Sequence, residues 1–169
     1  MKKHIIASVV VLSLAIAQLA AAQPAGAPAP SQPKWMSTPV KEMVDKARTA
    51  TKQVPLEEFK GAVDRKEDAV ILDVRNPNEY NAAHVPGAIN LARGLLEFNI
   101  WTVVPDKNKK IYVYCKTGGR AALATKQLNE LGYKNAVAVR EGMADWIKAK
   151  YPVKTTITDE DVVITRAGE

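Results

Sequence analysis

Short runs of apolar, mostly β-branched residues recur from residue 69 onward, and each run ends at polar or glycine-rich residues. Such unbroken runs, separated by segments of helical periodicity, are typical of strands buried on both faces of a parallel sheet. The three clearest runs cover residues 69–72, 111–114 and 136–139, and a weaker run covers 88–91. The pattern predicts an α/β fold built on a parallel sheet.

Apolar residues spaced three and four positions apart predict helices between these runs. The clearest helix extends from Arg120 to Leu131, and Gly132 supplies its stop signal. The predicted helices cover residues 40–51, 55–63, 77–83, 93–104, 120–131 and 143–150. We expect the first helix to pack on the domain through an apolar stripe formed by Val40, Met43, Val44, Ala47 and Ala50.

The N-terminal segment has the parts of a secretory signal peptide. Lys2 and Lys3 precede an apolar run over residues 5–17, and small residues stand at Ala20 and Ala22. This run is shorter than the roughly 20 strongly apolar residues that a membrane span requires. We therefore expect cleavage after Ala22 and a periplasmic or secreted mature protein.

Prolines mark the segment that follows the predicted signal peptide. Residues 23–39 hold five prolines and few large apolar side chains, which predicts an extended linker. The expected organisation is a signal peptide at 1–22, the linker at 23–39, a helix and connector at 40–53, a folded domain at 54–155 and a C-terminal tail at 156–169.

The composition is that of a globular protein, with 47% hydrophobic and 25% charged residues in a chain of 169. The formal net charge is +6, of which Lys2 and Lys3 contribute two charges. The other basic residues are interspersed with acidic ones, whereas a nucleic-acid-binding or polybasic membrane protein would concentrate them. We expect no nucleic-acid partner, and no membrane partner after signal cleavage. Nothing in the pattern specifies an oligomeric state.

A single cysteine stands where the apolar run 111–114 meets the clearest helix. The connecting residues are Cys115, Lys116, Thr117, Gly118, Gly119 and Arg120. Two glycines let the backbone turn tightly, and the start of a helix supplies unpaired N–H groups and the positive end of a dipole. Such a nest of N–H groups favours anions, including a thiolate. We interpret Cys115 as a reactive thiolate rather than a structural cysteine, with Lys116 and Arg120 adding positive charge.

Four separated motifs resemble those of the rhodanese (sulfurtransferase) family. The matching segments are Leu72-Asp73-Val74-Arg75 with Glu79-Tyr80, His84 to Asn90, Cys115 to Arg120, and Glu141-Gly142-Met143 with Trp146. The resemblance extends from about Glu57 to Val153. Two positions depart from the family pattern, because Ala83 and Glu141 stand where glycines are common.

The resemblance implies a rhodanese-like parallel sheet with helices on both faces, and sulfur transfer by double displacement. In that scheme the Cys115 thiolate takes the outer sulfur of an anionic donor such as thiosulfate. The resulting persulfide passes this sulfur to cyanide or to a thiol acceptor. The donor is bound by the loop residues Lys116, Thr117, Gly118, Gly119 and Arg120. No metal or organic cofactor is required.

Several residues near these motifs favour structural interpretations. Asp73 and Arg75 lie at a strand end near the expected ligand crevice, and we expect them to support the site by pairing with each other or with the loop backbone. We expect His84 to serve a turn or the core, since a thiolate held by N–H groups needs no base. Core packing is predicted for Tyr112, Tyr114 and Trp146.

Two alternative functions stay open at this point. Some relatives with this fold are cysteine-dependent phosphatases with a Cys-x5-Arg loop, whereas the spacing from Cys115 to Arg120 is one residue shorter. A shorter loop makes a smaller cradle, which suits a single sulfur better than a tetrahedral phosphate. The other alternative is a binding or sensing module that keeps the fold without turnover.

Overall fold

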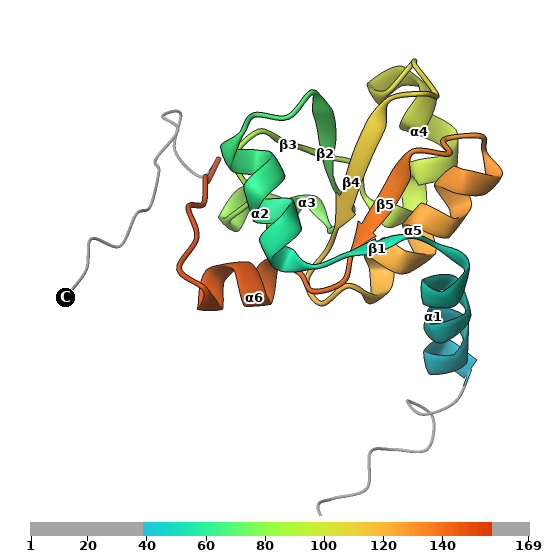
Figure 1. Ribbon diagram of the computed structural model, residues 1–169, viewed down its shortest axis with the longest axis horizontal. Coiled ribbons are helices and arrows are strands. Elements are labelled where there is room, and N and C mark those ends of the chain that lie inside the picture. The colour runs from blue at the N-terminus through green and yellow to red at the C-terminus, as the bar shows by residue number, and fades with distance from the viewer. Residues whose placement is uncertain (1–38, 157–169) are drawn as a thin grey trace, which may run out of the picture. The chain divides into compact units, whose positions relative to one another are not determined.

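The computed structural model describes residues 39–156 (Figure 1). The predicted signal peptide, residues 23–38 of the predicted linker and residues 157–169 of the predicted tail lie outside the described residues. Within residues 39–156, no helix is long and apolar enough to cross a membrane.

Strands and helices alternate along the described chain. The strands are β1 (Gln53–Val54), β2 (Ala69–Asp73), β3 (Ala88–Asn90), β4 (Lys110–Tyr114) and β5 (Ala136–Val139). The helices are α1 (Pro39–Ala50), α2 (Leu56–Asp64), α3 (Pro77–Ala82), α4 (Leu96–Val103), α5 (Gly119–Glu130) and α6 (Met143–Lys148). A short 3-10 helix, Arg93–Leu95, precedes α4.

The predicted elements are present, with three differences. The strand β1 was not predicted, because two residues are too few to show a pattern of alternation. The helix predicted over 93–104 begins with a 3-10 turn. The last helix ends at Lys148 rather than at Lys150, whose φ of 58° takes the chain out of helical geometry just before Tyr151 and Pro152. Gly132 has a φ of 100°, which confirms the predicted stop after α5.

The five strands of the described chain form one parallel sheet in the order β1-β5-β4-β2-β3. Asp73 at the end of β2 is in register with Tyr114 of β4 and with Asn90 of β3. The carboxyl ends of these three strands therefore lie side by side, and Cys115 follows β4 at this edge. In open parallel sheets this edge is where ligands bind.

Helices cover both faces of the sheet, which confirms the predicted fold class. Figure 1 shows α4 and α5 on one side and α2, α3 and α6 on the other. Alternate residues of β4 point to opposite faces. Ile111, Val113 and Cys115 belong to the core under α4 and α5, whereas Tyr112 and Tyr114 belong to the core under α2 and α6.

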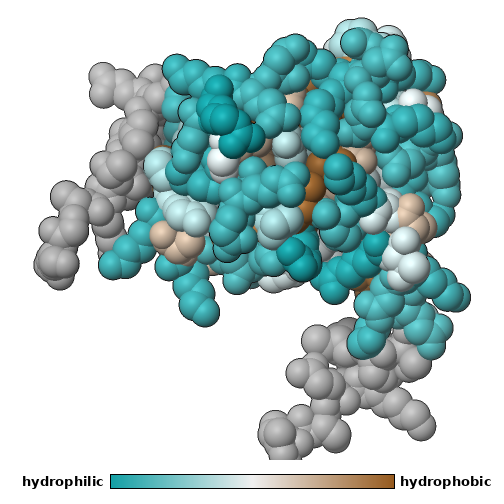
Figure 2. Space-filling view, viewed as in Figure 1, coloured by the Kyte–Doolittle hydropathy of each residue, from teal (hydrophilic) through white to brown (hydrophobic). Residues whose placement is uncertain are grey.

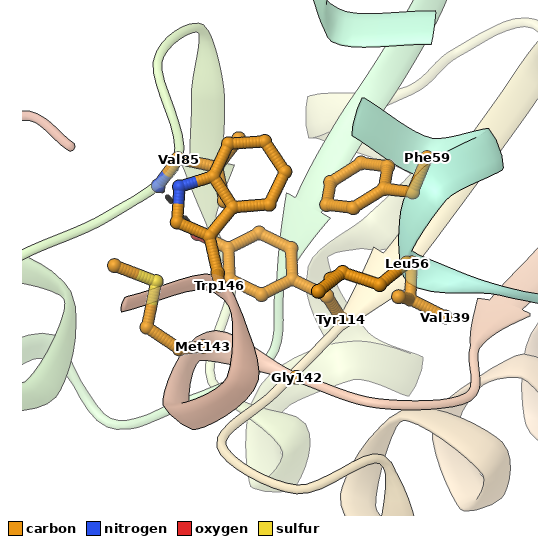
Figure 3. A pocket seen from close by; sticks show the side chains of 8 residues that line it. All are labelled: Leu56, Phe59, Val85, Tyr114, Val139, Gly142, Met143 and Trp146. Carbon is orange, nitrogen blue, oxygen red and sulfur yellow. Dashed lines mark hydrogen bonds between the residues drawn. The ribbon is translucent and has the colours of Figure 1, made fainter. Parts of the chain in front are cut away.

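The core under α2 and α6 is aromatic. The ring centroid of Phe59 lies 5.7 Å from that of Tyr112, 5.8 Å from that of Tyr114 and 5.4 Å from that of Trp146. Figure 3 shows the rings of Phe59, Tyr114 and Trp146 next to one another, and the side chains there leave no room for a water molecule. The predicted packing roles of Tyr112, Tyr114 and Trp146 are confirmed.

The helix α1 packs on α5, but through only part of its apolar stripe (Figure 1). Ala47 is buried, and Val44 lies against Gly119. Val40 and Met43 are 62% and 56% exposed, so the expectation that the whole stripe packs on the domain is wrong. The rest of the face drawn in Figure 2 is mostly hydrophilic, with apolar residues visible only in small areas.

Candidate active site

Cys115 is the first residue after β4, and its side chain is buried. The chain then turns through the exposed Lys116 and Thr117 and enters α5 at Gly119. Gly118 has a φ of 82°, in the left-handed region that favours glycine. A Cβ at Gly118 would lie only 2.1 Å from the carbonyl oxygen of Arg140, so a larger residue does not fit there.

The outer side of the loop is held by the start of α6. The N–H of Met143 donates to the carbonyl of Cys115 at 2.8 Å, and the N–H of Ala144 donates to the carbonyl of Lys116 at 3.1 Å. A Cβ at Gly142 would lie 2.5 Å from both of these carbonyl oxygens. Gly142 is therefore required by this close approach, although its own backbone is extended. The preceding position has no such neighbour, which explains why Glu141 is accommodated there.

The N–H groups of the loop are left available. Within the described chain, no acceptor is bonded to the backbone N–H of any residue from Lys116 to Ala121. The last of these residues form the first turn of α5, where N–H groups have no intrahelical partner and the helix dipole is positive. Since the first two carbonyls of the loop are bonded to α6, this loop offers donors on the side that α6 does not occupy. Such a concave set of donors binds an anion.

Arg120 is bound by a residue to which the sequence analysis assigned no role in the site. Its guanidinium donates to both carboxylate oxygens of Glu79, at 2.7 and 2.8 Å. These hydrogen bonds, with the charge of Arg120 and a bond from the N–H of Asn76, lower the pKa of Glu79 from 4.5 to about 2. Glu79 in turn raises the pKa of Arg120, with a smaller contribution from Cys115.

The available signal for Glu79 was its place in the first motif and in the capping box that Asn76 opens at α3. Nothing local connected it to Arg120, which is 41 positions away along the chain. Lys116 differs from Arg120, because it is exposed and forms no ion pair with any residue in the described range. The donor-binding roles of Lys116, Thr117, Gly118, Gly119 and Arg120 stay predictions.

The expected pairing of Asp73 with Arg75 is present. Asp73 is 0% exposed, and its carboxylate accepts from the Nε of Arg75 at 2.9 and 3.0 Å and from Nη2 at 2.6 Å. Arg75 also donates to the carbonyl of Ala83 at 2.7 Å. Burial opposes the charge of Arg75, but the hydrogen bonds and charge of Asp73 outweigh it and raise the pKa of Arg75. This pair holds the chain after β2 rather than facing the Cys115 loop.

His84 occupies a structural position, as expected. It is buried, its Nδ1 lies 3.0 Å from the carbonyl oxygen of Tyr80, and its ring stacks on that of Tyr80. Its backbone pairs with Lys154 in an isolated antiparallel bridge. The preceding Ala83 is extended, with a φ of −169°, so no glycine is needed at this position.

This arrangement joins a nucleophile to an anion-binding loop. A thiol at the end of β4, free N–H groups at the start of α5 and the side chains of Lys116 and Arg120 lie within six consecutive residues. Such a site can form a covalent intermediate at sulfur and stabilise negative charge upon it. The part of the chain that the structure describes contains no group of three or more His, Cys, Asp or Glu residues able to hold a metal ion.

Comparison with protein families matches residues 55–149 to the rhodanese-like domain. The chain belongs to this family. The matched residues include β2, the Cys115 loop and α6, but they begin after α1 and β1. This rhodanese-family protein is therefore sulfurtransferase-like, and α1 is an addition to the family's common part.

Two relatives with assigned names are sulfurtransferases. The chain is 44% identical over 62 residues to the thiosulfate sulfurtransferase PspE of Escherichia coli, a match that covers 37% of this chain and 60% of PspE. It is 34% identical over 91 residues to the thiosulfate:glutathione sulfurtransferase of Saccharomyces cerevisiae, which covers 47% of this chain and 66% of that protein. Each match spans less than two thirds of the relative's length.

A similar solved structure is that of RPA3614 from Rhodopseudomonas palustris, described as a protein of unknown function and possible tyrosine phosphatase. The two chains are 27% identical with a TM-score of 0.65, and the match covers 73% of this chain and 99% of the other. The likeness confirms the α/β fold with a parallel sheet and flanking helices.

Proposed function

We propose that this protein transfers sulfane sulfur from an anionic donor such as thiosulfate to cyanide or to a thiol, through a persulfide on Cys115. The observation that carries the proposal is the single thiol at the mouth of a loop whose carbonyls are bonded to α6 and whose N–H groups are unbonded. The sulfurtransferase relatives support the same chemistry.

The first half-reaction forms the persulfide. The thiolate of Cys115 attacks the outer sulfur of thiosulfate, and a new S–S bond forms as the bond between the two thiosulfate sulfurs breaks. Sulfite leaves with the electron pair of that bond. The negative charge of the nucleophile passes to the terminal sulfur, which the N–H groups between Lys116 and Ala121 stabilise in the same loop.

The second half-reaction returns the enzyme to its starting state. Cyanide or a thiolate attacks the terminal sulfur, and the S–S bond of the persulfide breaks. Thiocyanate or a new persulfide leaves, and Cys115 is again a thiolate. Both steps exchange one anionic sulfur for another, so the loop carries the same charge throughout and needs no proton donor. This agrees with the structural position of His84.

The decisive experiment is the intact mass of the protein after incubation with thiosulfate. We expect a gain of one sulfur atom, which cyanide removes with release of thiocyanate. The variant Cys115→Ser should gain no sulfur. Absence of an adduct in the wild type, with folding intact, would support a binding or sensing module instead.

The phosphatase alternative is tested in the same preparation, since RPA3614 is described as a possible tyrosine phosphatase. The loop of this chain has four residues between Cys115 and Arg120, and the bidentate bond to Glu79 occupies both terminal nitrogens of that arginine. We therefore expect no hydrolysis of p-nitrophenyl phosphate. Turnover of that substrate, lost in Cys115→Ser, would favour the phosphatase.

We also propose that the protein is exported and cleaved after Ala22. The support is the order of basic, apolar and small residues in the sequence. N-terminal sequencing of the protein recovered from the cell envelope should start at Gln23. A full-length product that needs detergent for extraction would contradict the proposal.

A further inference from the structure

A groove of about 340 Å³ lies beside the active-site loop, on the same side of the sheet. It is lined by Met43 and Lys46 of α1, Arg93 of the 3-10 helix, and Leu123, Lys126 and Gln127 of α5. The first of these elements, α1, lies outside the part of the chain that the rhodanese-like family model matches. The groove is therefore made in part by an addition to the family's common fold.

Three contacts connect this groove to the loop. Val44 of α1 would lie 3.7 Å from a Cβ on Gly119, so α1 contacts the first residue of α5. The N–H of Arg93 donates to the carbonyl of Val74 at 3.2 Å, and the N–H of Val74 donates to the carbonyl of Tyr114 at 3.0 Å. The groove wall is thus bonded to the residue that precedes Cys115.

The alternation along β4 places Cys115 on the groove side of the sheet. Cys115 belongs to the core that α4 and α5 cover, together with Ala121 and Ala124 of α5. Leu123 and Gln127 follow Gly119 by four and eight positions, so both lie on the stripe of α5 that starts at the loop. At a rise of about 1.5 Å per residue, the groove extends roughly 6–12 Å from the loop along this helix.

The lining of the groove combines apolar side chains with positive charge. Met43 and Leu123 are apolar, and three cations surround them. Arg93 pairs with Glu97 at 2.8 Å, and Lys126 pairs with Glu130. Lys46 forms no ion pair with any residue between 39 and 156, and its side chain is exposed. Lys46 is therefore the cation best able to take a new carboxylate.

We propose that this groove is the acceptor subsite and that it binds a small thiol bearing carboxylates, of about tripeptide length. The inference rests on the proposed sulfur transfer. A tripeptide extends to roughly 10 Å, so its thiol can reach the Cys115 persulfide while its carboxylate lies near Lys46. The acceptor thiolate attacks the terminal sulfur, the Cys115 S–S bond breaks, and the acceptor leaves as a persulfide anion.

The test compares glutathione with acceptors that cannot use the groove. In Lys46→Glu we expect the KM for glutathione to rise about fivefold or more, because an attractive charge becomes a repulsive one. The KM values for cyanide and 2-mercaptoethanol, and the rate of persulfide formation from thiosulfate, should stay at wild-type levels. High salt should raise the wild-type KM for glutathione towards that of the variant.

Lys41→Gln is the matched control. Lys41 also lies on α1 and is exposed, but it pairs with Asp45 and does not line the groove. We expect its kinetics with glutathione to equal those of the wild type. An unchanged KM for glutathione in Lys46→Glu, or an equal rise in Lys41→Gln, would overturn the subsite while leaving persulfide formation intact.

A binding measurement keeps the groove testable without turnover. S-methylglutathione cannot accept sulfur, and we expect it to bind Cys115→Ser with calorimetrically measurable affinity that falls at least about fivefold when Lys46→Glu is added. If no persulfide forms on the wild type, the proposed function fails, and this measurement still decides whether the groove binds such a ligand. No binding, or binding unaffected by Lys46→Glu, would refute the subsite.

Discussion

Two neighbouring segments at one edge of the sheet use charged residues in opposite ways. The segment after β2 carries Asp73 and Arg75, whose side chains are 0% and 6% exposed and bound to each other. The segment after β4 carries Lys116, which is exposed, and N–H groups that have no acceptor in the described chain. The two strands are in register, with Asp73 opposite Tyr114.

The difference shows that position at the ligand-binding edge does not by itself make a charge functional. The charges after β2 satisfy each other and shape the chain, since Arg75 also bonds Ala83 before the second motif. The loop after β4 has its carbonyls bonded and its donors unbonded, so it can still respond to an anion. Substitutions in the first segment should therefore affect stability, and those in the second should affect activity.

The largest expected effect is the loss of activity in Cys115→Ser. Sulfur transfer should fall to background, because the hydroxyl cannot form a persulfide, while the free energy of unfolding changes by only about 1 kcal/mol. Thiocyanate formation and urea denaturation measure the two quantities. Retained transfer in this variant would remove Cys115 from the mechanism.

Asp73→Asn should show the reverse, with the largest effect on stability. It leaves the guanidinium of Arg75 buried without its counter-charge, which typically costs about 3–5 kcal/mol. The control is Asp45→Asn, which breaks the exposed ion pair with Lys41 and should cost less than about 0.5 kcal/mol. Equal losses in urea denaturation would contradict a distinct role for the buried pair.

Gly118→Ala tests whether the loop depends on its backbone. The left-handed φ and the 2.1 Å approach to the carbonyl of Arg140 predict a loss of about 3 kcal/mol of stability, together with reduced persulfide formation. Gly94→Ala is the control, since no atom lies within 4 Å of its Cβ position, and it should change stability by less than about 0.5 kcal/mol. Similar thermal midpoints for the two variants would show that the loop tolerates a side chain.

Glu79→Gln should alter the dependence of stability on pH. The folded-state pKa of Glu79, about 2, lies below its ordinary 4.5, so its contribution is complete above pH 4.5 and is lost as the pH falls towards 2. We expect the variant to be about 1 kcal/mol less stable at pH 7, since the pair is about one third exposed, and equal to the wild type near pH 2. Urea denaturation between pH 7 and 2 tests this, with the exposed Glu57→Gln as control. A stability gap that persists at pH 2 would exclude the ion pair as its cause.

Lys116→Ala should have the smallest effect, confined to donor binding. We expect a five- to tenfold rise in the KM for thiosulfate, on the order of 1 kcal/mol, with little change in kcat, because an exposed charge attracts the dianion without organising the nucleophile. Steady-state kinetics at low and high salt measure it, with Lys52→Ala as control. A fall in kcat at constant KM would instead assign Lys116 to the nucleophile.

Much of the fold was predictable from local sequence because burial leaves a periodic signature. A strand covered on both faces is apolar throughout, which identified β2, β4 and β5. A cysteine, two glycines and a helix start in succession identified the loop, since all the groups that build it lie within six residues. The short β1 left no such signature, because its existence depends on pairing with the edge of β5.

The sequence by itself determined which residues form the parallel sheet, where the thiol stands and which backbone supports it, because these properties depend on neighbouring residues. Only the tertiary structure decided which residues meet across the chain. Glu79 reaches Arg120 over 41 positions, and Gly142 is required by the carbonyls of a loop that precedes it by more than 20 residues. The partly exposed stripe of α1 likewise follows from where α1 meets α5. Such contacts depend on strand order and register, which periodicity along the chain does not encode.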